Sequence, residues 1–242
     1  MSIELVKKLE ATWPQLPPDL REAYLAVDRA RFVRPCDRDL AAENWPLPLD
    51  TPLGRTLPPF AEILARNDGQ VQRVMADAEF AAAIATISAP LIYALGFRVL
   101  GLAAGHRLLE LGSGSGYGAA LASHVVGPTG HVTTLEIDPH LVELTRANLG
   151  GTANVTVLEG DGLARPDLVA GHDHVWLTFS TAQVPRALAD ALPEGGVLLA
   201  PIGPPPPAAQ RWKRIERKAG AFLETEAPFP VMFIRSRSGG GG

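Results

Sequence analysis

The spacing of apolar residues predicts helices in the first part of the chain. Residues 2–34 show helical periodicity in two runs, the second of which begins at a pair of prolines. Residues 35–58 are rich in proline and show little periodicity, which predicts an ordered but irregular loop. Helical spacing returns over 59–84, in two pieces around NDG at 67–69, and again from about residue 90 to 102. One helical face near the N-terminus carries Ile3, Leu5, Val6 and Leu9.

From residue 107 onward the pattern changes, because short apolar runs begin to alternate with helical stretches. This alternation is typical of βαβ units, which form a mostly parallel sheet with helices on both faces and right-handed crossovers. Residues 211–235 contain strand-like runs around Gly220 with no helix between them, which predicts an antiparallel hairpin at the sheet edge. The predicted fold class is α/β: a doubly wound, Rossmann-like sheet, mostly parallel with antiparallel C-terminal strands, preceded by N-terminal helices. The predicted strands are 107–111, 131–137, 154–160, 172–178 and 196–202, and the helices between them are 116–126, 139–149 and 184–192.

Charge and composition exclude several classes of protein. The formal net charge is −4, from 22 basic and 26 acidic residues, and Glu216 interrupts the basic run at 211–218, so nucleic acid is not an expected partner. Cys36 is the only cysteine, which excludes a disulfide framework and a cysteine-based metal site. No apolar run reaches the ~20 residues that span a bilayer, and the N-terminus lacks the pattern of a signal peptide. We therefore expect a cytoplasmic protein that does not bind membranes.

The most informative stretch is LLELGSGSGYG, residues 108–118, in which a strand leads into a glycine-rich loop and then a helix. Ligands of doubly wound sheets bind at the carboxyl ends of the strands, where this loop lies. Gly112, Gly114 and Gly116 let the backbone approach a ligand closely, and the first N–H groups of the next helix remain free to donate. The spacing of Gly114, Gly116 and Ala119 also fits a dinucleotide fingerprint, which is a weak signal. The loop predicts a cradle for a ligand without identifying the ligand.

Three acidic residues at the ends of successive predicted strands narrow the choice of ligand. A buried carboxylate at Glu110, just before the glycines, would repel a pyrophosphate and favour a cation, such as the sulfonium and ammonium groups of S-adenosylmethionine. Glu136 ends the next strand, where an acidic residue accepts hydrogen bonds from ribose hydroxyls, although that feature fits NAD as well. Asp161 follows the third strand and is placed to accept from an adenine amino group. Each acid alone could also be a helix N-cap or a solvated loop residue, an explanation that carries more weight for Asp161 than for Glu136, but together they favour S-adenosylmethionine.

With LEID at 135–138 and VLEGDG at 157–162, the glycine-rich stretch resembles the nucleotide-binding half of class I methyltransferases. Within that superfamily the chain most resembles the protein-L-isoaspartate (D-aspartate) O-methyltransferase family. The more specific matches are TISAP at 86–90 and VPRALADALPEGGVLLAPIG at 184–203. The resemblance covers nearly the whole chain apart from about residues 53–85. Further matches are RFV at 31–33, PLPL at 46–49, Gln210 and PVMFIR at 230–235.

The resemblance implies an enzyme that transfers a methyl group from S-adenosylmethionine, with S-adenosylhomocysteine as product, to a side-chain or isoaspartyl carboxylate of a peptide or protein. The ester is expected to lead to a succinimide (aspartimide), and the protein is expected to be a monomer. By the same resemblance Ser88 lies beside the methyl group and the acceptor carboxylate, and Thr86 lines the same pocket. The cofactor-binding residues are expected to be Glu110, Gly112, Ser113, Gly114, Gly116, Tyr117, Glu136, Ile137, Asp161, Gly162 and Thr178.

A carboxylate acceptor explains why the sequence offers no evident general base. Its reference pKa is near 3.9, so it is ionised at neutral pH and needs only to be positioned. Ser88 has an alternative role as N-cap of the helix that Pro90 begins. No metal site is predicted, because His172 and His174 precede a strand with no third ligand nearby.

Departures from the family pattern fall on the predicted acceptor side. Ala89 stands where the family has glutamine, Phe179 lies in a run that is usually rich in alanine, and residues 53–85 are an apparent insertion. We therefore divide the chain into a substrate-side segment, 1–85, a methyltransferase core, 86–237, and a flexible glycine tail, 238–242. Three alternatives stay open: a methyltransferase dedicated to one peptide of a ribosomal-peptide (lanthipeptide or graspetide type) biosynthetic cluster, a non-catalytic peptide-binding fold, and an NAD-dependent oxidoreductase, for which no hydride-chemistry residues are visible.

Overall fold

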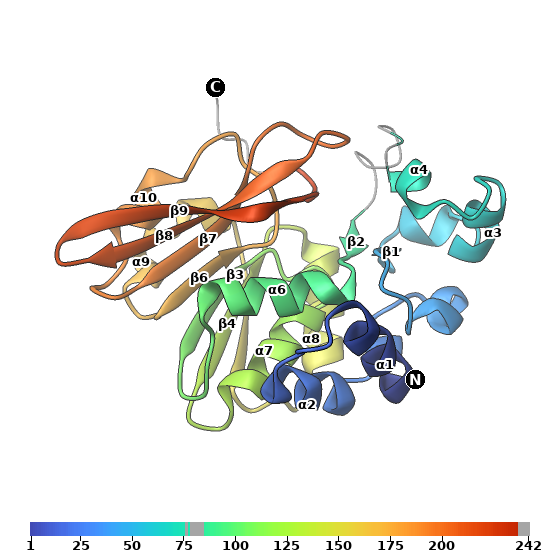
Figure 1. Ribbon diagram of the computed structural model, residues 1–242, viewed down its shortest axis with the longest axis horizontal. Coiled ribbons are helices and arrows are strands. Elements are labelled where there is room, and N and C mark those ends of the chain that lie inside the picture. Colours follow the sequence, from blue (N-terminus) through green and yellow to red (C-terminus); the bar gives the residue numbers. More distant parts are fainter. Residues whose placement is uncertain (76, 78–84, 237–242) are drawn as a thin grey trace.

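The computed structural model describes residues 1–75, 77 and 85–236 (Figure 1). Its main feature is a seven-stranded sheet in the order β5-β4-β3-β6-β7-β8-β9. The first five strands in this order are parallel, and β8 and β9 form an antiparallel hairpin at one edge. The predicted fold class is confirmed. The strands are β3 (Arg107–Leu111), β4 (His131–Glu136), β5 (Val155–Glu159), β6 (His174–Leu177), β7 (Val197–Ile202), β8 (Gln210–Lys218) and β9 (Ala221–Val231).

The sheet separates two hydrophobic cores, because successive side chains of a strand point to opposite faces. In β3, Leu108 belongs to the core that includes residues of α6, α7 and α8, whereas Leu109 and Leu111 belong to the core that includes residues of α9 and α10. Trp176 of β6 and Trp212 of β8, both fully buried, fill the first core. These helices are α6 (Pro90–Leu100), α7 (Tyr117–Val126), α8 (Pro139–Leu149), α9 (Pro166–Val169) and α10 (Arg186–Asp190).

The N-terminal helices pack outside the helices that cover the first face of the sheet and join the same hydrophobic core (Figure 1). The helix α1 (Ser2–Thr12) packs against α2 (Pro18–Ala26), and α2 packs against α7. The predicted irregular loop contains two short 3-10 helices, a third lies just before it, and the two helical pieces predicted after it are present within the described residues. These elements are η1 (Arg29–Arg31), η2 (Pro35–Leu40), η3 (Gly54–Thr56), α3 (Phe60–Ala65) and α4 (Val71–Met75).

Two local features differ from the sequence-based expectations. A two-residue strand β1 (Leu47–Pro48) pairs antiparallel with β2 (Thr86–Ile87), and strands this short leave no periodic signal. The helix predicted to reach residue 102 ends at Leu100, because Gly101 takes a left-handed φ of 76° that closes it.

Part of the apparent insertion, residues 76 and 78–84, and the predicted tail at 238–242 lie outside the described residues. Within the described part of the chain, no helix is long and apolar enough to cross a membrane.

Candidate active site

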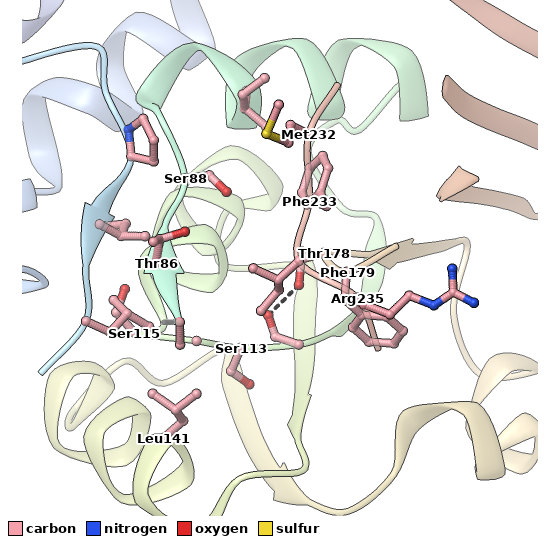
Figure 2. Close-up of a pocket in the computed structure, with 18 of the residues that line it drawn as sticks. Thr86, Ser88, Ser113, Ser115, Leu141, Thr178, Phe179, Met232, Phe233 and Arg235 are labelled. Carbon is pink, nitrogen blue, oxygen red and sulfur yellow. Dashed lines mark hydrogen bonds between the residues drawn. The ribbon is translucent and has the colours of Figure 1, made fainter. Parts of the chain in front are cut away.

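A cavity of about 470 Å³ opens at the carboxyl ends of the parallel strands. It is lined by residues that follow or end β3, β4, β5 and β6, by the turn between β2 and α6, and by residues 230–236 (Figure 2). This is the edge of the sheet where the glycine loop and the three acidic residues were expected to meet. Glu110, Glu136 and Asp161 all line the cavity, so the structure brings the three predicted acids together.

The glycine-rich loop is held against the end of β6. Gly112 has a φ of 101°, and a Cβ at this position would collide with the Thr178 hydroxyl. That hydroxyl donates to the carbonyl oxygen of Leu111 at 2.9 Å and also to that of Gly112. From α8, the Thr145 hydroxyl donates to the carbonyl oxygen of Gly114 at 3.0 Å. The predicted residues Gly112, Ser113, Gly114 and Thr178 all line the cavity.

Glu136 ties the loop to the end of β4. Its carboxylate accepts from the backbone N–H groups of Gly114 at 2.9 Å, Ile137 at 2.9 Å and Asp138 at 3.2 Å. A carboxylate offers about four lone-pair positions, so capacity remains for a ligand hydroxyl. Ile137 lies at the rim and is 38% exposed, which leaves an apolar surface beside this carboxylate.

Glu110 is the most buried acid of the site, with 1% of its surface exposed. Its Oε2 accepts from the Thr134 hydroxyl at 2.6 Å, and that hydroxyl lies 2.6 Å from the hydroxyl of Ser113. Burial raises the pKa of Glu110 to about 8, against the opposing effect of the Thr134 hydrogen bond. Glu110 is therefore largely protonated at pH 7 unless a cation lies beside it. The structure corrects the sequence-based expectation that Glu110 always carries a negative charge.

Asp161 and Gly162 lie at the third strand end. The Asp161 carboxylate accepts from the N–H of Leu163 at 2.9 Å and so caps η4 (Gly162–Ala164), as the N-cap alternative proposed. Both residues also line the cavity. Capping and contact with a ligand are thus compatible at this position.

Gly116 and Tyr117, which we predict to bind the cofactor, are not among the described residues that line the cavity. Gly116 begins α7 with a φ of 83°, and a Cβ there would press on Leu149. The Tyr117 ring is fully buried, with its centroid 5.2 Å from that of Phe32 and 5.3 Å from that of Tyr93. These positions serve the packing of α7.

Ser88 and Thr86 lie on the opposite side of the cavity from the β6 end. Figure 2 shows both side chains directed toward the space that Met232 and Phe233 border from the other side. The N-cap of α6 is Ala89, without a side-chain cap, so the alternative that Ser88 caps this helix is wrong. The Ser88 hydroxyl is instead directed toward the cavity.

Residues 230–236 form the facing wall. Ser180 exchanges two backbone hydrogen bonds with this segment, at 2.7 and 3.0 Å. Gln210, which is 1% exposed, donates from Nε2 to the carbonyl oxygen of Pro204 at 2.8 Å and accepts from the N–H of Phe233 at 2.8 Å. One buried amide therefore joins the loop before β8 to the wall of the cavity.

Two lining residues carry no motif that could have identified them. Trp45 and Val71 line the cavity from irregular or short segments, where no periodicity distinguishes a core residue from a cavity residue, whereas Met232 lies within the PVMFIR match. Thr134 could have been found, because Thr134 and Glu110 are register partners in neighbouring parallel strands. Phe179, singled out as a departure, also lines the cavity.

The two histidines considered as metal ligands lie at the other end of β6. His172 Nδ1 donates to the carbonyl oxygen of Leu168 at 2.7 Å, because a carbonyl oxygen can only accept, so Nδ1 is protonated. Its Nε2 lies 2.8 Å from the hydroxyl of Thr133. His174 Nε2 lies 2.9 Å from His106 Nδ1. No group of three or more potential metal ligands occurs among the described residues.

Comparison with known proteins identifies the relatives of this chain. A family model described as protein-L-isoaspartate(D-aspartate) O-methyltransferase matches residues 66–239, so the match begins within the 53–85 segment that showed no evident resemblance. A protein-L-isoaspartate O-methyltransferase of Ignicoccus hospitalis is 32% identical over 233 residues, covering 96% of this chain and 94% of that protein. One from Rhodopseudomonas palustris is 35% identical over 220 residues, covering 90% of this chain and 84% of that protein.

Two solved structures share the fold. A protein-L-isoaspartate O-methyltransferase superposes with a TM-score of 0.76 at 24% identity, and the match covers 100% of this chain and 66% of the other chain. A second structure is described as a putative protein-L-isoaspartate O-methyltransferase from Plasmodium falciparum in complex with S-adenosyl-L-homocysteine. It superposes with a TM-score of 0.70 at 20% identity, and the match covers 96% of this chain and 95% of that one. The family match and the curated relatives together decide the assignment: this chain belongs to the protein-L-isoaspartate(D-aspartate) O-methyltransferase family.

Proposed function

We propose that this protein transfers the methyl group of S-adenosylmethionine to the carboxylate of an isoaspartyl residue in proteins or peptides. The observation that carries the proposal is one cavity with two chemically different sides. Three acids and a glycine loop border one side, and two hydroxyls with an apolar wall border the other. The names of the curated relatives support the same acceptor.

The residues of the acidic side fit S-adenosylmethionine. A Cβ on Gly112 would meet the Thr178 hydroxyl, so the lack of a side chain lets this loop, which borders the cavity, lie close against the end of β6. Glu136 is placed to accept from ribose hydroxyls and Asp161 from an amino group, while the apolar rim at Ile137 suits a base. Glu110 gains from a nearby cation, because a positive charge favours its ionised form.

Bound S-adenosylmethionine supplies an electrophilic methyl group on a positively charged sulfur, with S-adenosylhomocysteine as product. The acceptor carboxylate is ionised at neutral pH, so no residue has to remove a proton from it. The hydroxyls of Ser88 and Thr86 are placed to donate to one carboxylate oxygen and direct the other. Such positioning supplies on the order of 7–11 kcal/mol of the barrier in well-oriented reactions.

We propose further that the methyl ester closes to a succinimide. A neutral methyl ester has a better leaving group than a carboxylate, so the following backbone amide nitrogen attacks the ester carbonyl, the N–H proton is lost and methanol leaves. This ring closure needs no group from the protein. Repeated methylation and hydrolysis would then return isoaspartyl sites to aspartate.

The test compares a peptide containing one isoaspartyl residue with the same peptide containing aspartate. We expect a mass increase of ~14 Da on the isoaspartyl peptide alone, followed by methanol release. Ser88→Ala should lower kcat roughly 10- to 100-fold, whereas Ser123→Ala, a serine outside the cavity lining, should leave it unchanged. Binding of S-adenosylmethionine with no methylation of any isoaspartyl peptide would contradict the proposal.

A second acceptor is favoured by one observation: Val71 of α4 contributes to the cavity, so the 53–85 segment reaches the acceptor side. This arrangement suits a dedicated aspartyl substrate of a ribosomal-peptide pathway. Rapid methylation of a generic isoaspartyl peptide would eliminate that version and leave general repair. Slow methylation of every generic peptide, with tight binding of S-adenosylmethionine, would favour it.

A further inference from the structure

The turn that carries Ser88 is held by a buried arginine from a distant part of the chain. Arg29 of η1 is 1% exposed. Its Nη2 donates to the carbonyl oxygens of Ser88 at 3.1 Å and Trp45 at 2.7 Å. Its Nη1 donates to those of Ala41 at 3.3 Å and Glu43 at 2.9 Å. One guanidinium therefore joins the loop at 41–45 to the β2–α6 turn, and both Trp45 and Ser88 line the cavity.

Arg29 differs from the other fully buried arginine of the described chain. Arg34 is paired with Asp37 at 2.6 Å, as expected for a charge removed from water. All the hydrogen-bond acceptors found for Arg29 are backbone carbonyls, and no carboxylate lies within ion-pair distance among the described residues. Burial lowers the pKa of Arg29, so keeping its charge in the core is costly. The planar fork of an arginine, however, suits several fixed acceptors at once.

The other backbone group of Ser88 is also held from the core. The Tyr93 hydroxyl of α6 accepts from the Ser88 N–H at 3.2 Å. The carbonyl oxygen and the N–H of Ser88 are thus each held by a buried group, Arg29 and Tyr93 respectively, on either side of the Ser88 side chain.

We propose that Arg29 and Tyr93 are positioning residues, which fix the Ser88 hydroxyl relative to the loop bearing Trp45 so that the acceptor carboxylate is aligned for methyl transfer. The inference rests on the proposed function of Ser88. Misplacement of a positioning group by about 1 Å costs up to roughly 100-fold in rate, and loops hold such geometry poorly without support from a rigid core. Neither residue needs to change protonation for this role.

A matched pair of tyrosines separates positioning from general stability. Tyr24 is as buried as Tyr93 and donates to the Pro90 carbonyl oxygen at 2.6 Å, but it makes no hydrogen bond to Ser88. We expect Tyr93→Phe to lower kcat for an isoaspartyl peptide at least ~10-fold with affinity for S-adenosylmethionine unchanged by calorimetry. Tyr24→Phe should lower Tm by a similar amount and change kcat less than about twofold. Equal kcat values for the two variants would overturn the role of Tyr93.

A second pair tests Arg29 without removing a buried charge. Arg29→Lys keeps the charge but loses the fork, and Arg34→Lys makes the same change beside Asp37. We expect at least a ~10-fold loss of kcat in the first variant and under about a threefold loss in the second, measured well below both Tm values. If kcat falls in both variants in proportion to their loss of Tm, Arg29 acts only on stability, and the proposal is overturned.

Amide hydrogen exchange provides a readout that does not depend on catalysis. In Arg29→Lys and Tyr93→Phe, residues 85–92 should exchange at least ~5-fold faster, with the 108–118 loop unchanged. Unchanged exchange at 85–92 in both variants would overturn the proposal even if activity fell. Failure of the wild-type protein to methylate any isoaspartyl peptide would overturn the proposed function instead, and the exchange experiment would still decide whether Ser88 is held as described.

Discussion

The Glu110 carboxyl lies under the glycine loop with a hydrogen bond from Thr134 and almost no exposure to solvent. Its pKa is raised to about 8 by burial, above the value of 4.5 that it has when unfolded. The folded state therefore retains this proton up to pH 8, and the contribution of Glu110 to stability falls as pH rises from 4.5 to 8. A sulfonium or ammonium beside the carboxylate offsets that loss. Ionisation of Glu110 thus lowers the stability of the ligand-free protein, whereas it would raise the affinity for a cationic ligand.

Glu110→Gln separates the two effects. We expect this variant to have a higher Tm than the wild type at pH 8, because the buried charge is gone, and to bind S-adenosylmethionine roughly 10-fold more weakly. The affinity of the wild type should rise between pH 6 and 8, and that of the variant should rise less over the same range. Calorimetry at three pH values and thermal unfolding check this. Identical pH profiles for the two proteins would contradict it.

Gly112→Ala tests the close contact between the glycine loop and the end of β6. The added Cβ meets the Thr178 hydroxyl and is strained by the φ of 101°. We expect a loss of about 1–3 kcal/mol in stability and at least a ~10-fold loss of affinity for S-adenosylmethionine. Gly195→Ala is the matched control, because its φ is 79° and no atom lies within 4 Å of the new Cβ. Unfolding in urea and calorimetry should show that only the first variant loses the ligand.

Elements differ in how far the sequence predicts them. The parallel strands and their helices are predicted well, because each buried strand is a short apolar run and each helix has its own periodicity; α8 begins and ends where the pattern places it. β1 and β2 are too short for any periodicity, although they place Thr86 and Ser88. The acids at the strand ends follow from topology, whereas Arg29 contacts Ser88 across 59 positions of sequence, and local sequence contains no information on such a contact.

Packing between α6 and the sheet gives a prediction at the scale of elements. Gly96 of α6 lies on the ring of Trp176 in β6, and a Cβ there would overlap the indole. Gly96→Ala should cost about 1–3 kcal/mol, because the fully buried Trp176 has no room to move away. Gly171→Ala, whose Cβ meets nothing closer than 3.8 Å, is the control. A free energy of unfolding equal to that of the control would show that the helix shifts freely on the sheet.

Across the whole molecule, the sheet has its cavity at one end and buried histidines at the other. Burial lowers the pKa of His172, and it lowers that of His174 to about 4, with His106 adding to the effect. Because these folded pKa values lie below the unfolded value of 6.5, their stabilising contribution is complete above pH 6.5 and is lost as pH falls toward 4. Glu110 acts in the opposite direction over part of this range. The wild-type pH profile therefore contains two opposing slopes.

The contribution of the buried histidines to the pH dependence of stability can be measured once the Glu110 carboxyl is removed. In the Glu110→Gln background, we expect the free energy of unfolding to fall by about 2 kcal/mol between pH 7 and pH 5. Adding His174→Asn should remove most of this fall, and His124→Gln, at an exposed position, should not. Urea denaturation at both pH values measures it. A fall that is the same with and without His174 would assign the acid sensitivity to other groups.

The buried amide of Gln210 has a consequence for engineering. Its hydrogen bonds to the Pro204 carbonyl oxygen and the Phe233 N–H join the loop before β8 to the cavity wall that follows β9, so these two segments depend on each other. Replacing both segments together with those of a relative, with Gln210 kept, should change peptide preference while the affinity for the methyl donor stays the same.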